Sequence, residues 1–375
     1  MLDLLPAELV LTIVERTSDS PWDRKTLLDS ICAVNKSYRR VFEPLAGRFV
    51  QVKSNDTLEL IRETWSDAKK IAAHVLLIGP ETSAGSTLEG CDVRLARRFL
   101  VSLPMIREVR FRNVNSLGRP KTTSATKVEL CLSNRQMLFR IEALMLQRCF
   151  ILVTTGIGCL PLNLKHLCID LRTLDDRFCP ALGLGTLLQT CYLPHLETLR
   201  LDCEEVPHVQ PQFLAGLRLV QLAATPMDDP FAADPLDSEV PNSFLTTETP
   251  VLLTYWSWPT DEDCAKMNRP DLLHYVQLNM PEEDIATATM FLARLPNLKA
   301  AFVRVLPRRQ EGAASPEPEV PASDADYNLH IASLERIMAA RGVDLIWADS
   351  DEHAFISPSF ARDSAMTHVL ATPAV

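Results

Sequence analysis

"LETLRL" (residues 196–201) places apolar residues at its first, fourth and sixth positions. Successive side chains of a strand point to opposite faces, so the fourth and sixth positions share one face. The first position turns into the same core from the approach to the strand. We therefore predict a strand here and in the five stretches that share this spacing: "IREVRF" (106–111), "IEALML" (141–146), "LKHLCI" (164–169), "LRLVQL" (217–222) and "LHYVQL" (273–278).

This spacing resembles the Leu-x-x-Leu-x-Leu pattern of leucine-rich repeats, whose units stack into a solenoid with a parallel sheet along its inner side. The first positions are 106, 141, 164, 196, 217 and 273, so the steps are 35, 23, 32, 21 and 56 residues. We expect degenerate repeats, with one unrecognised unit near residues 253–258. The alternative is an ordinary α/β domain whose parallel strands share the spacing.

The remaining segments predict the outer wall and the later strands. Helices are expected at residues 94–103, 184–193 and 282–295, and further strands at 298–303 and 343–347. Residues 226–250 and 307–327 are rich in proline and acid, which predicts loops.

The opening stretch "LDLLPAELVLTIVE" (2–15) predicts a helix, because Leu5, Leu9 and Ile13 recur at four-residue spacing and Pro6 lies near the first turn. Residues 25–52 predict two or three short helices, with Pro44 ending or kinking one of them. A unit of about 50 residues buries its apolar surface poorly by itself. Part of that surface is therefore free for a partner or for the rest of the chain.

Composition excludes several classes of function. The formal net charge of -10 disfavours nucleic acid and anionic lipid as partners. The 10 cysteines show no paired spacing typical of a zinc site. The acidic start is unlike a secretory leader and no run of 18 apolar residues occurs, so we expect a chain that works in the cytoplasm or nucleus without a membrane span.

Motifs of enzyme chemistry are weak. "GPETSAGST" (79–87) lacks the lysine of a phosphate-binding loop, and no Gly-x-Ser-x-Gly motif occurs. "ADSDEHAF" (348–355) gathers Asp349, Asp351, Glu352 and His353, which could bind a metal or act as acid and base, but an exposed turn explains them better. We expect no catalytic residue, metal or cofactor.

Residues 4 to 52 resemble an F-box of the fungal type. "LLPAELVLTIV" (4–14) matches the family's Leu-Pro-x-Glu-Leu-x-x-x-Ile, and residues 27–52 are similar to its Leu-x-x-x-x-x-Val-x-Lys-x-x-Arg continuation. The segment 16–26 is longer than the family's linker. F-box helices pack against a Skp-type adaptor, which docks on a cullin and thereby on a RING protein and a ubiquitin-conjugating enzyme.

The resemblance implies specific adaptor contacts. Leu5, Pro6, Leu9 and Ile13 would supply the first adaptor-facing helix. Residues on the later helices would pack the module or touch the adaptor, namely Ile31, Val34 and Tyr38.

The combined expectation is an α/β chain with a helical F-box module over residues 1–52 and an irregular leucine-rich-repeat-like solenoid with a curved parallel sheet over 53–375. Such a chain would be a non-catalytic substrate adaptor of an SCF-type cullin-RING ubiquitin ligase, holding an unknown client on its repeats. The alternatives are a repeat scaffold unrelated to ubiquitin, whose first helices cap the solenoid, and an enzyme centred on residues 349–353.

Client contacts are expected at exposed positions of the strands. The candidates are His166, Glu197, Arg200, His274 and Gln277. Arg107, Arg110 and Arg112 suggest a basic patch or, more simply, a solvated face.

Overall fold

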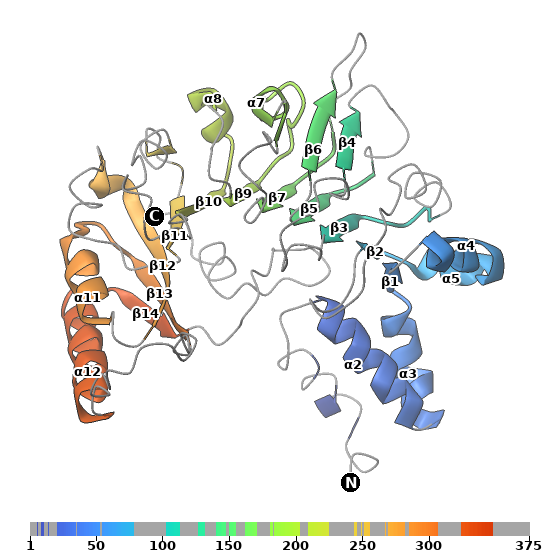
Figure 1. Ribbon diagram of the computed structural model, residues 1–375, viewed down its shortest axis with the longest axis horizontal. Helices are drawn as coiled ribbons and strands as arrows, with labels where there is room; N and C mark the ends of the chain where they lie inside the picture. Colours follow the sequence, from blue (N-terminus) through green and yellow to red (C-terminus); the bar gives the residue numbers. More distant parts are fainter. Residues whose placement is uncertain are drawn as a thin grey trace, which may run out of the picture. The chain divides into compact units, whose positions relative to one another are not determined.

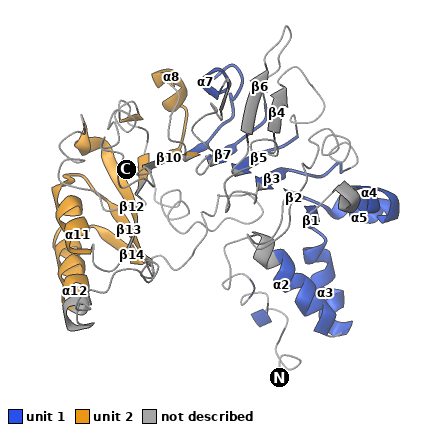
Figure 2. Cartoon of the chain, in the orientation of Figure 1, with its two compact units in different colours: residues 1–200, 350–363 blue, residues 201–349, 364–375 orange. Residues whose placement is uncertain are grey.

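The computed structural model covers residues 1–375 and divides into two compact units, which Figure 2 colours separately. Unit 1 is residues 1–200 with 350–363, and unit 2 is residues 201–349 with 364–375. The structure describes these residues: 6, 9–10, 14, 21–34, 36–52, 55–78, 103–112, 127–131, 140–147, 150–154, 162–170, 181–182, 184–202, 209–224, 244–245, 249, 251–255, 267, 269–281, 285–306 and 324–347. The division falls at residue 200, and the expected boundary at residue 52 stays a prediction.

Among the described residues, 11 strands form one parallel sheet in the order β1-β2-β3-β5-β7-β9-β10-β11-β12-β13-β14. Unit 1 contributes to this sheet the strands β1 (Phe49–Val52), β2 (Val75–Ile78), β3 (Glu108–Arg112), β5 (Ala143–Gln147) and β7 (His166–Asp170). β9 (Thr198–Asp202) contains the point at which the chain passes into unit 2. The predicted α/β class and the parallel sheet are confirmed.

The repeated stretches of unit 1 pair position for position. Val109 of β3 lies opposite Leu144 of β5, which lies opposite Leu167 of β7. All three are buried, as are the first and sixth positions of the same stretches. The predicted apolar face is therefore confirmed, and each strand adds the same row of side chains to it.

A second sheet in unit 1 was not expected from the sequence. It consists of β4 (Lys127–Cys131), β6 (Phe150–Thr154) and β8 (Ala181–Leu182), which are parallel and adjacent in that order. Their order repeats that of β3, β5 and β7, so each of three successive chain segments gives one strand to each sheet. Figure 1 shows β4 and β6 side by side, with α7 (Leu184–Leu187) near them.

The strands of the second sheet take the place of part of the helical outer wall that the sequence predicted. The helix expected at 184–193 is reduced to the short α7, and the helix expected at 94–103 lies outside the described residues except for its last position. The elements that follow β3, β5 and β7 in the described part of the chain are the strands β4, β6 and β8 rather than helices.

Four helices belong to the N-terminal part of unit 1. They are α2 (Pro21–Val34), α3 (Lys36–Ala46), α4 (Asn55–Thr64) and α5 (Asp67–Ala72). Pro44 lies in the last turn of α3, as expected of a residue that ends a helix. The segment predicted to be helical up to residue 52 instead ends in β1, a short run of strand-favouring apolar residues that is buried except at the half-buried Gln51.

Unit 2 alternates strands and helices. Its strands are β10 (Leu219–Ala224), β11 (Val251–Tyr255), β12 (Leu273–Pro281), β13 (Ala300–Leu306) and β14 (Asp344–Trp347). Its helical segments are α8 (Pro211–Leu214), the 3-10 turn η3 (Pro270–Leu272), α11 (Ile285–Arg294) and α12 (Asp324–Ala340).

The later predictions fall within unit 2. The helix expected at 282–295 and both later strands are confirmed as α11, β13 and β14, and β11 is the unrecognised unit near residue 253. α12 begins inside the second expected loop, whose residues 307–323 lie outside the described ranges. No helix in the described ranges is long and apolar enough to cross a membrane.

Candidate protein-docking surfaces

The N-terminal helices are held on the sheet by one hydrophobic cluster. Tyr38, Phe42 and Ala46 recur at four-residue spacing, so they lie on one face of α3. The Tyr38 and Phe42 rings meet edge to face, with centroids 5.9 Å apart. The full cluster is Val10, Val14, Leu28, Tyr38, Phe42, Ala46, Phe49, Val75 and Leu77.

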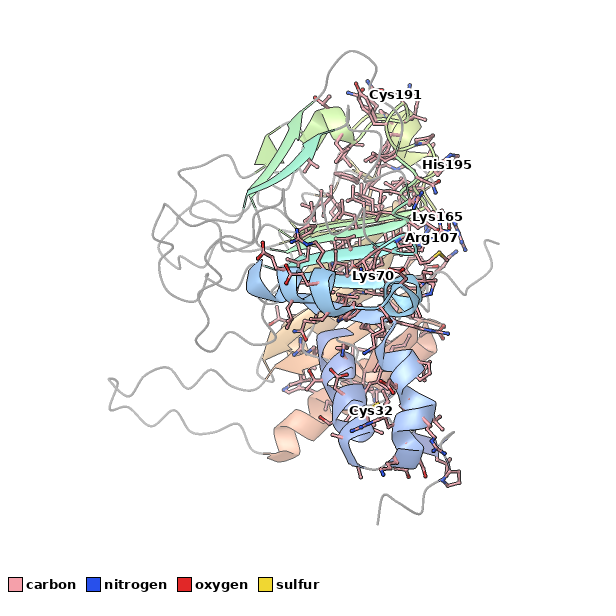
Figure 3. The ribbon with its side chains drawn as sticks, turned by 90° about the vertical axis from the view of Figure 1, so that its right-hand side faces the viewer. Cys32, Lys70, Arg107, Lys165, Cys191 and His195 are labelled. Carbon is pink, nitrogen blue, oxygen red and sulfur yellow. The ribbon has the colours of Figure 1, made fainter. Side chains whose placement is uncertain are left out.

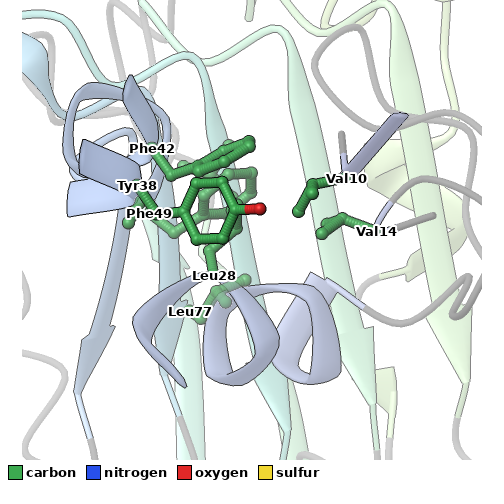
Figure 4. Packing of buried hydrophobic residues seen from close by; sticks show 9 residues of the cluster. Val10, Val14, Leu28, Tyr38, Phe42, Phe49 and Leu77 are labelled. Carbon is green, nitrogen blue, oxygen red and sulfur yellow. The ribbon is translucent and has the colours of Figure 1, made fainter. Parts of the chain in front are cut away.

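The sheet supplies the other side of this cluster. Phe49 of β1 pairs with Val75 of β2, and Leu77 lies two residues further along the same face. Figure 4 shows Val10 and Val14 pointing toward the aromatic residues of the cluster. Val10, Val14 and the helices α2 and α3 therefore pack on β1 and β2.

Several apolar side chains in the N-terminal part of unit 1 stay exposed to solvent. Leu9 is 52% exposed, Val34 is 53% exposed and Val41 is 48% exposed. Pro6 is exposed too, and its carbonyl oxygen accepts hydrogen bonds from the backbone N–H groups of Leu9 and Val10 at 3.1 and 3.2 Å. We call Pro6, Leu9, Val34 and Val41 the exposed apolar set.

The predicted adaptor-facing residues separate into three groups. Pro6, Leu9 and Val34 are exposed. Tyr38 is buried in the cluster and Ile31 packs against it, so these two pack the module. Leu5 and Ile13 lie outside the described residues. Val10 and Val14 are buried in the cluster although they lie outside the predicted stripe, whose four-residue spacing they share.

The residues just before the strands of unit 1 form a column. Backbone hydrogen bonds join these residues from one strand to the next. In each bond the N–H group donates to the carbonyl oxygen of the equivalent residue before the preceding strand: His74 to Arg48, Arg107 to His74, Glu142 to Arg107, Lys165 to Glu142 and Glu197 to Lys165. These N···O distances run from 2.7 to 2.9 Å. We call the six residues the approach column: Arg48, His74, Arg107, Glu142, Lys165 and Glu197.

Two cations of the approach column share one carboxylate. Arg107 Nη1 lies 3.3 Å from Glu142 Oε1, and Lys165 Nζ lies 3.1 Å from Glu142 Oε2. The side chains of Arg107 and Lys165 are 49% and 41% exposed. Figure 3 shows Arg107 and Lys165 close together along one side of unit 1, with His195 further along the same side.

The face of the unit 1 sheet opposite the repeated apolar face carries buried charge. Arg110 and Glu108 are both buried, and the guanidinium of Arg110 donates from Nε to the carboxylate of Glu108. Arg110 Nη1 also lies 3.8 Å from the Met145 sulfur on β5. Burial of Arg110 contradicts both the basic patch and the solvated face that Arg107, Arg110 and Arg112 suggested. The side chain of Arg112 lies outside the described ones.

Two of the predicted client-facing residues are also buried. Arg200 is 1% exposed and Gln277 is 9% exposed, so both predictions of exposure are wrong. Gln277 Oε1 accepts a hydrogen bond from Gln221 Nε2 at 3.4 Å. Strand alternation places these side chains on the face of the sheet opposite the repeated apolar face. It does not predict whether other parts of the chain cover that opposite face.

The two histidines among the candidates are partly buried. His166 Nδ1 lies 2.9 Å from Thr198 Oγ1, and burial lowers the pKa of His166 despite the opposing effect of Glu197. Burial also lowers the pKa of His274, with Lys299 acting in the same direction. Glu197 is half-buried.

The two segments with weak enzyme motifs, residues 79–87 and 348–355, lie outside the described ranges. Within those ranges, no group of three or more His, Cys, Asp or Glu side chains could hold a metal ion.

No protein-family model matches this chain, and a search of curated proteins finds no matching sequence.

Proposed function

We propose that this chain is a substrate-recognition adaptor of an SCF-type cullin-RING ubiquitin ligase. Its N-terminal helices would bind a Skp-type adaptor, and its repeat body would bind a client protein. The observation that carries the proposal is the exposure of Leu9, of Val34 on α2 and of Val41 on α3, beside residues that are already buried against the sheet.

The energetics favour a docking role for these side chains. The helices α2 and α3 are held on the sheet by Tyr38, Phe42 and their neighbours, so the exposed apolar set is not needed for that packing. Full burial of a valine or leucine side chain contributes about 1.5–3 kcal/mol. Covering the exposed half of each side chain would contribute a part of this to binding.

The mechanism would be positional. A client held on the repeat body and a transfer enzyme held through the Skp-type adaptor would share one complex, which raises the effective concentration of client lysines near that enzyme. No side chain of this chain needs to take part in the chemistry.

The solenoid interpretation rests on the repeated pairing within unit 1. Val109, Leu144 and Leu167 occupy equivalent positions of adjacent strands, and β4, β6 and β8 repeat the same order in the second sheet. Stacked units that cover one another in this way are the basis of repeat proteins, which present long binding surfaces.

The test is the affinity of the full chain for a purified Skp-type adaptor, measured by isothermal titration calorimetry. We expect binding by the wild type and its loss in the Leu9→Asp, Val34→Asp double variant, because two carboxylates would have to be desolvated at the interface. The matched control is Leu60→Asp, since Leu60 of α4 is 60% exposed and outside the exposed apolar set. Circular dichroism checks that all variants fold.

A second candidate is a repeat scaffold unrelated to ubiquitin, whose first helices cap the sheet. It is favoured by the packing of Val10 and Val14 in one cluster with Val75 and Leu77 of β2. A folded wild-type chain that does not bind the Skp-type adaptor would support this scaffold and contradict the ligase proposal.

A further inference from the structure

We infer that the approach column of unit 1 is a docking edge for an acidic peptide segment, whose carboxylates bind Arg107 and Lys165 in competition with Glu142. The inference does not depend on the adaptor proposal. It concerns an edge of the sheet that the exposed apolar set does not include.

The backbone fixes the spacing of the charged side chains. The hydrogen bonds from Arg107 to His74, from Glu142 to Arg107 and from Lys165 to Glu142 join consecutive strand approaches. Neighbouring strands lie about 4.8 Å apart, so Arg107 and Lys165 are separated by about 10 Å. The residues that present the charges are thus held in a rigid row.

Basic groups outnumber acidic ones along this edge. The column contains Arg48, Arg107 and Lys165, against Glu142 and Glu197. Arg140 and His195 are exposed residues of the same strand approaches. This local excess of positive charge stands out in a chain whose formal net charge is -10.

Glu142 shows how a carboxylate binds here. Its two oxygens lie 3.3 Å from Arg107 Nη1 and 3.1 Å from Lys165 Nζ. A guanidinium has five N–H donors and an ammonium has three, and this bridge uses one of each. Because both cations are nearly half exposed, a further carboxylate from solvent can reach them.

Spacing and charge favour a peptide over a nucleic acid. A peptide in the polyproline II conformation has three residues per turn and rises about 3.1 Å per residue, so acidic side chains three residues apart lie on one side and span about 9 Å, close to the separation of Arg107 from Lys165. A phosphate backbone carries uniform negative charge, which Glu142 and Glu197 would repel. Discrete carboxylates can instead alternate with the acidic positions of the column.

The experiment measures fluorescence anisotropy of a labelled peptide of about 12 residues, with glutamate at every third position in a glycine and serine background. We expect the full chain to bind it at low salt and to lose affinity as salt rises, because exposed charges are screened. Arg107→Gln and Lys165→Gln should each weaken binding about threefold to tenfold. Glu142→Gln should strengthen it by about the same factor, since the competing carboxylate is gone.

The matched control is Arg336→Gln, which removes an exposed cation from α12 and should leave the affinity unchanged. A peptide with glutamine in place of glutamate should not bind, and circular dichroism should show all variants folded. The inference is overturned if the wild type does not bind the glutamate peptide, if Glu142→Gln weakens binding, or if a labelled oligouridine binds more tightly than the peptide.

Discussion

Arg341 donates a hydrogen bond from Nη1 to the carbonyl oxygen of Leu292 at 2.6 Å. Its Nη2 group donates to the carbonyl oxygen of Leu295, just beyond the end of α11. The last carbonyls of a helix lack partners within the helix and carry partial negative charge, so a guanidinium there is favourable. Arg341 therefore ties the end of α12 to the end of α11.

Arg341→Met should lower the free energy of unfolding by about 1–2 kcal/mol, because both carbonyls lose a charged donor. Urea denaturation followed by circular dichroism measures the change. Arg336→Met is the control, since Arg336 is exposed on α12. Equal losses in the two variants would show that the loss of a cation, rather than the contact with α11, sets the effect.

Gly342→Ala should cost about 1 kcal/mol of stability, because Gly342 has φ +67°, which other L residues adopt with strain. An added Cβ would meet nothing within 4 Å, so the cost comes from the backbone alone. Gly216→Ala is the comparison, since its Cβ would lie 3.5 Å from the Phe213 carbonyl oxygen, an ordinary contact. Thermal unfolding should show a lower Tm for Gly342→Ala and little change for Gly216→Ala.

Arg110→Met should destabilise unit 1 by about 3–5 kcal/mol, because the buried carboxylate of Glu108 loses its cation. Adding Glu108→Leu should recover much of this loss, since an apolar pair leaves no buried charge. A double-mutant cycle in urea measures the coupling. Additive losses in the double variant would show that the two side chains act independently.

Acidification should destabilise the chain partly through His166. Its pKa is lowered in the folded protein, mainly by burial, so the unfolded chain takes up the proton more readily. Stability should therefore be full above the ordinary histidine pKa of about 6.5 and fall as the pH drops below it.

His166→Gln should reduce this dependence, which urea denaturation at about pH 7.5 and about pH 5.5 would measure. The control is His195→Gln, because His195 is exposed. An unchanged loss of stability in His166→Gln would assign the acid sensitivity to other groups.

The parallel sheet could be predicted because its signal is local. Ile106, Val109 and Phe111 show the spacing that recurs in five other stretches, and the structure buries all three. The second sheet could not be found in this way. "FILVT" of β6 is a short continuous apolar run without that spacing, and such runs do not by themselves indicate which partner they pair with.

The candidate surfaces were only partly predictable. Four-residue spacing identifies both Leu9 and Val10 as members of helical stripes, and only the packing of α3 and β2 decides that Val10 is buried and Leu9 is exposed. Similarly, strand alternation separates Arg200 from the apolar core, but burial of the opposite face depends on contacts remote in the sequence. The bridge from Glu142 to Arg107 and Lys165 needs the register between strands, which no single stretch contains.

The matching strand orders of the two sheets make the length of this chain adjustable. β5 pairs in parallel with β3, and β6 pairs in parallel with β4. In the same way, β7 pairs with β5 and β8 pairs with β6. A duplicate of residues 108–142 could therefore be inserted after residue 142 and would meet compatible hydrogen-bonding edges on both sides in both layers. Protein engineers could lengthen or shorten the body in whole segments and so vary the distance between its ends without designing a new fold.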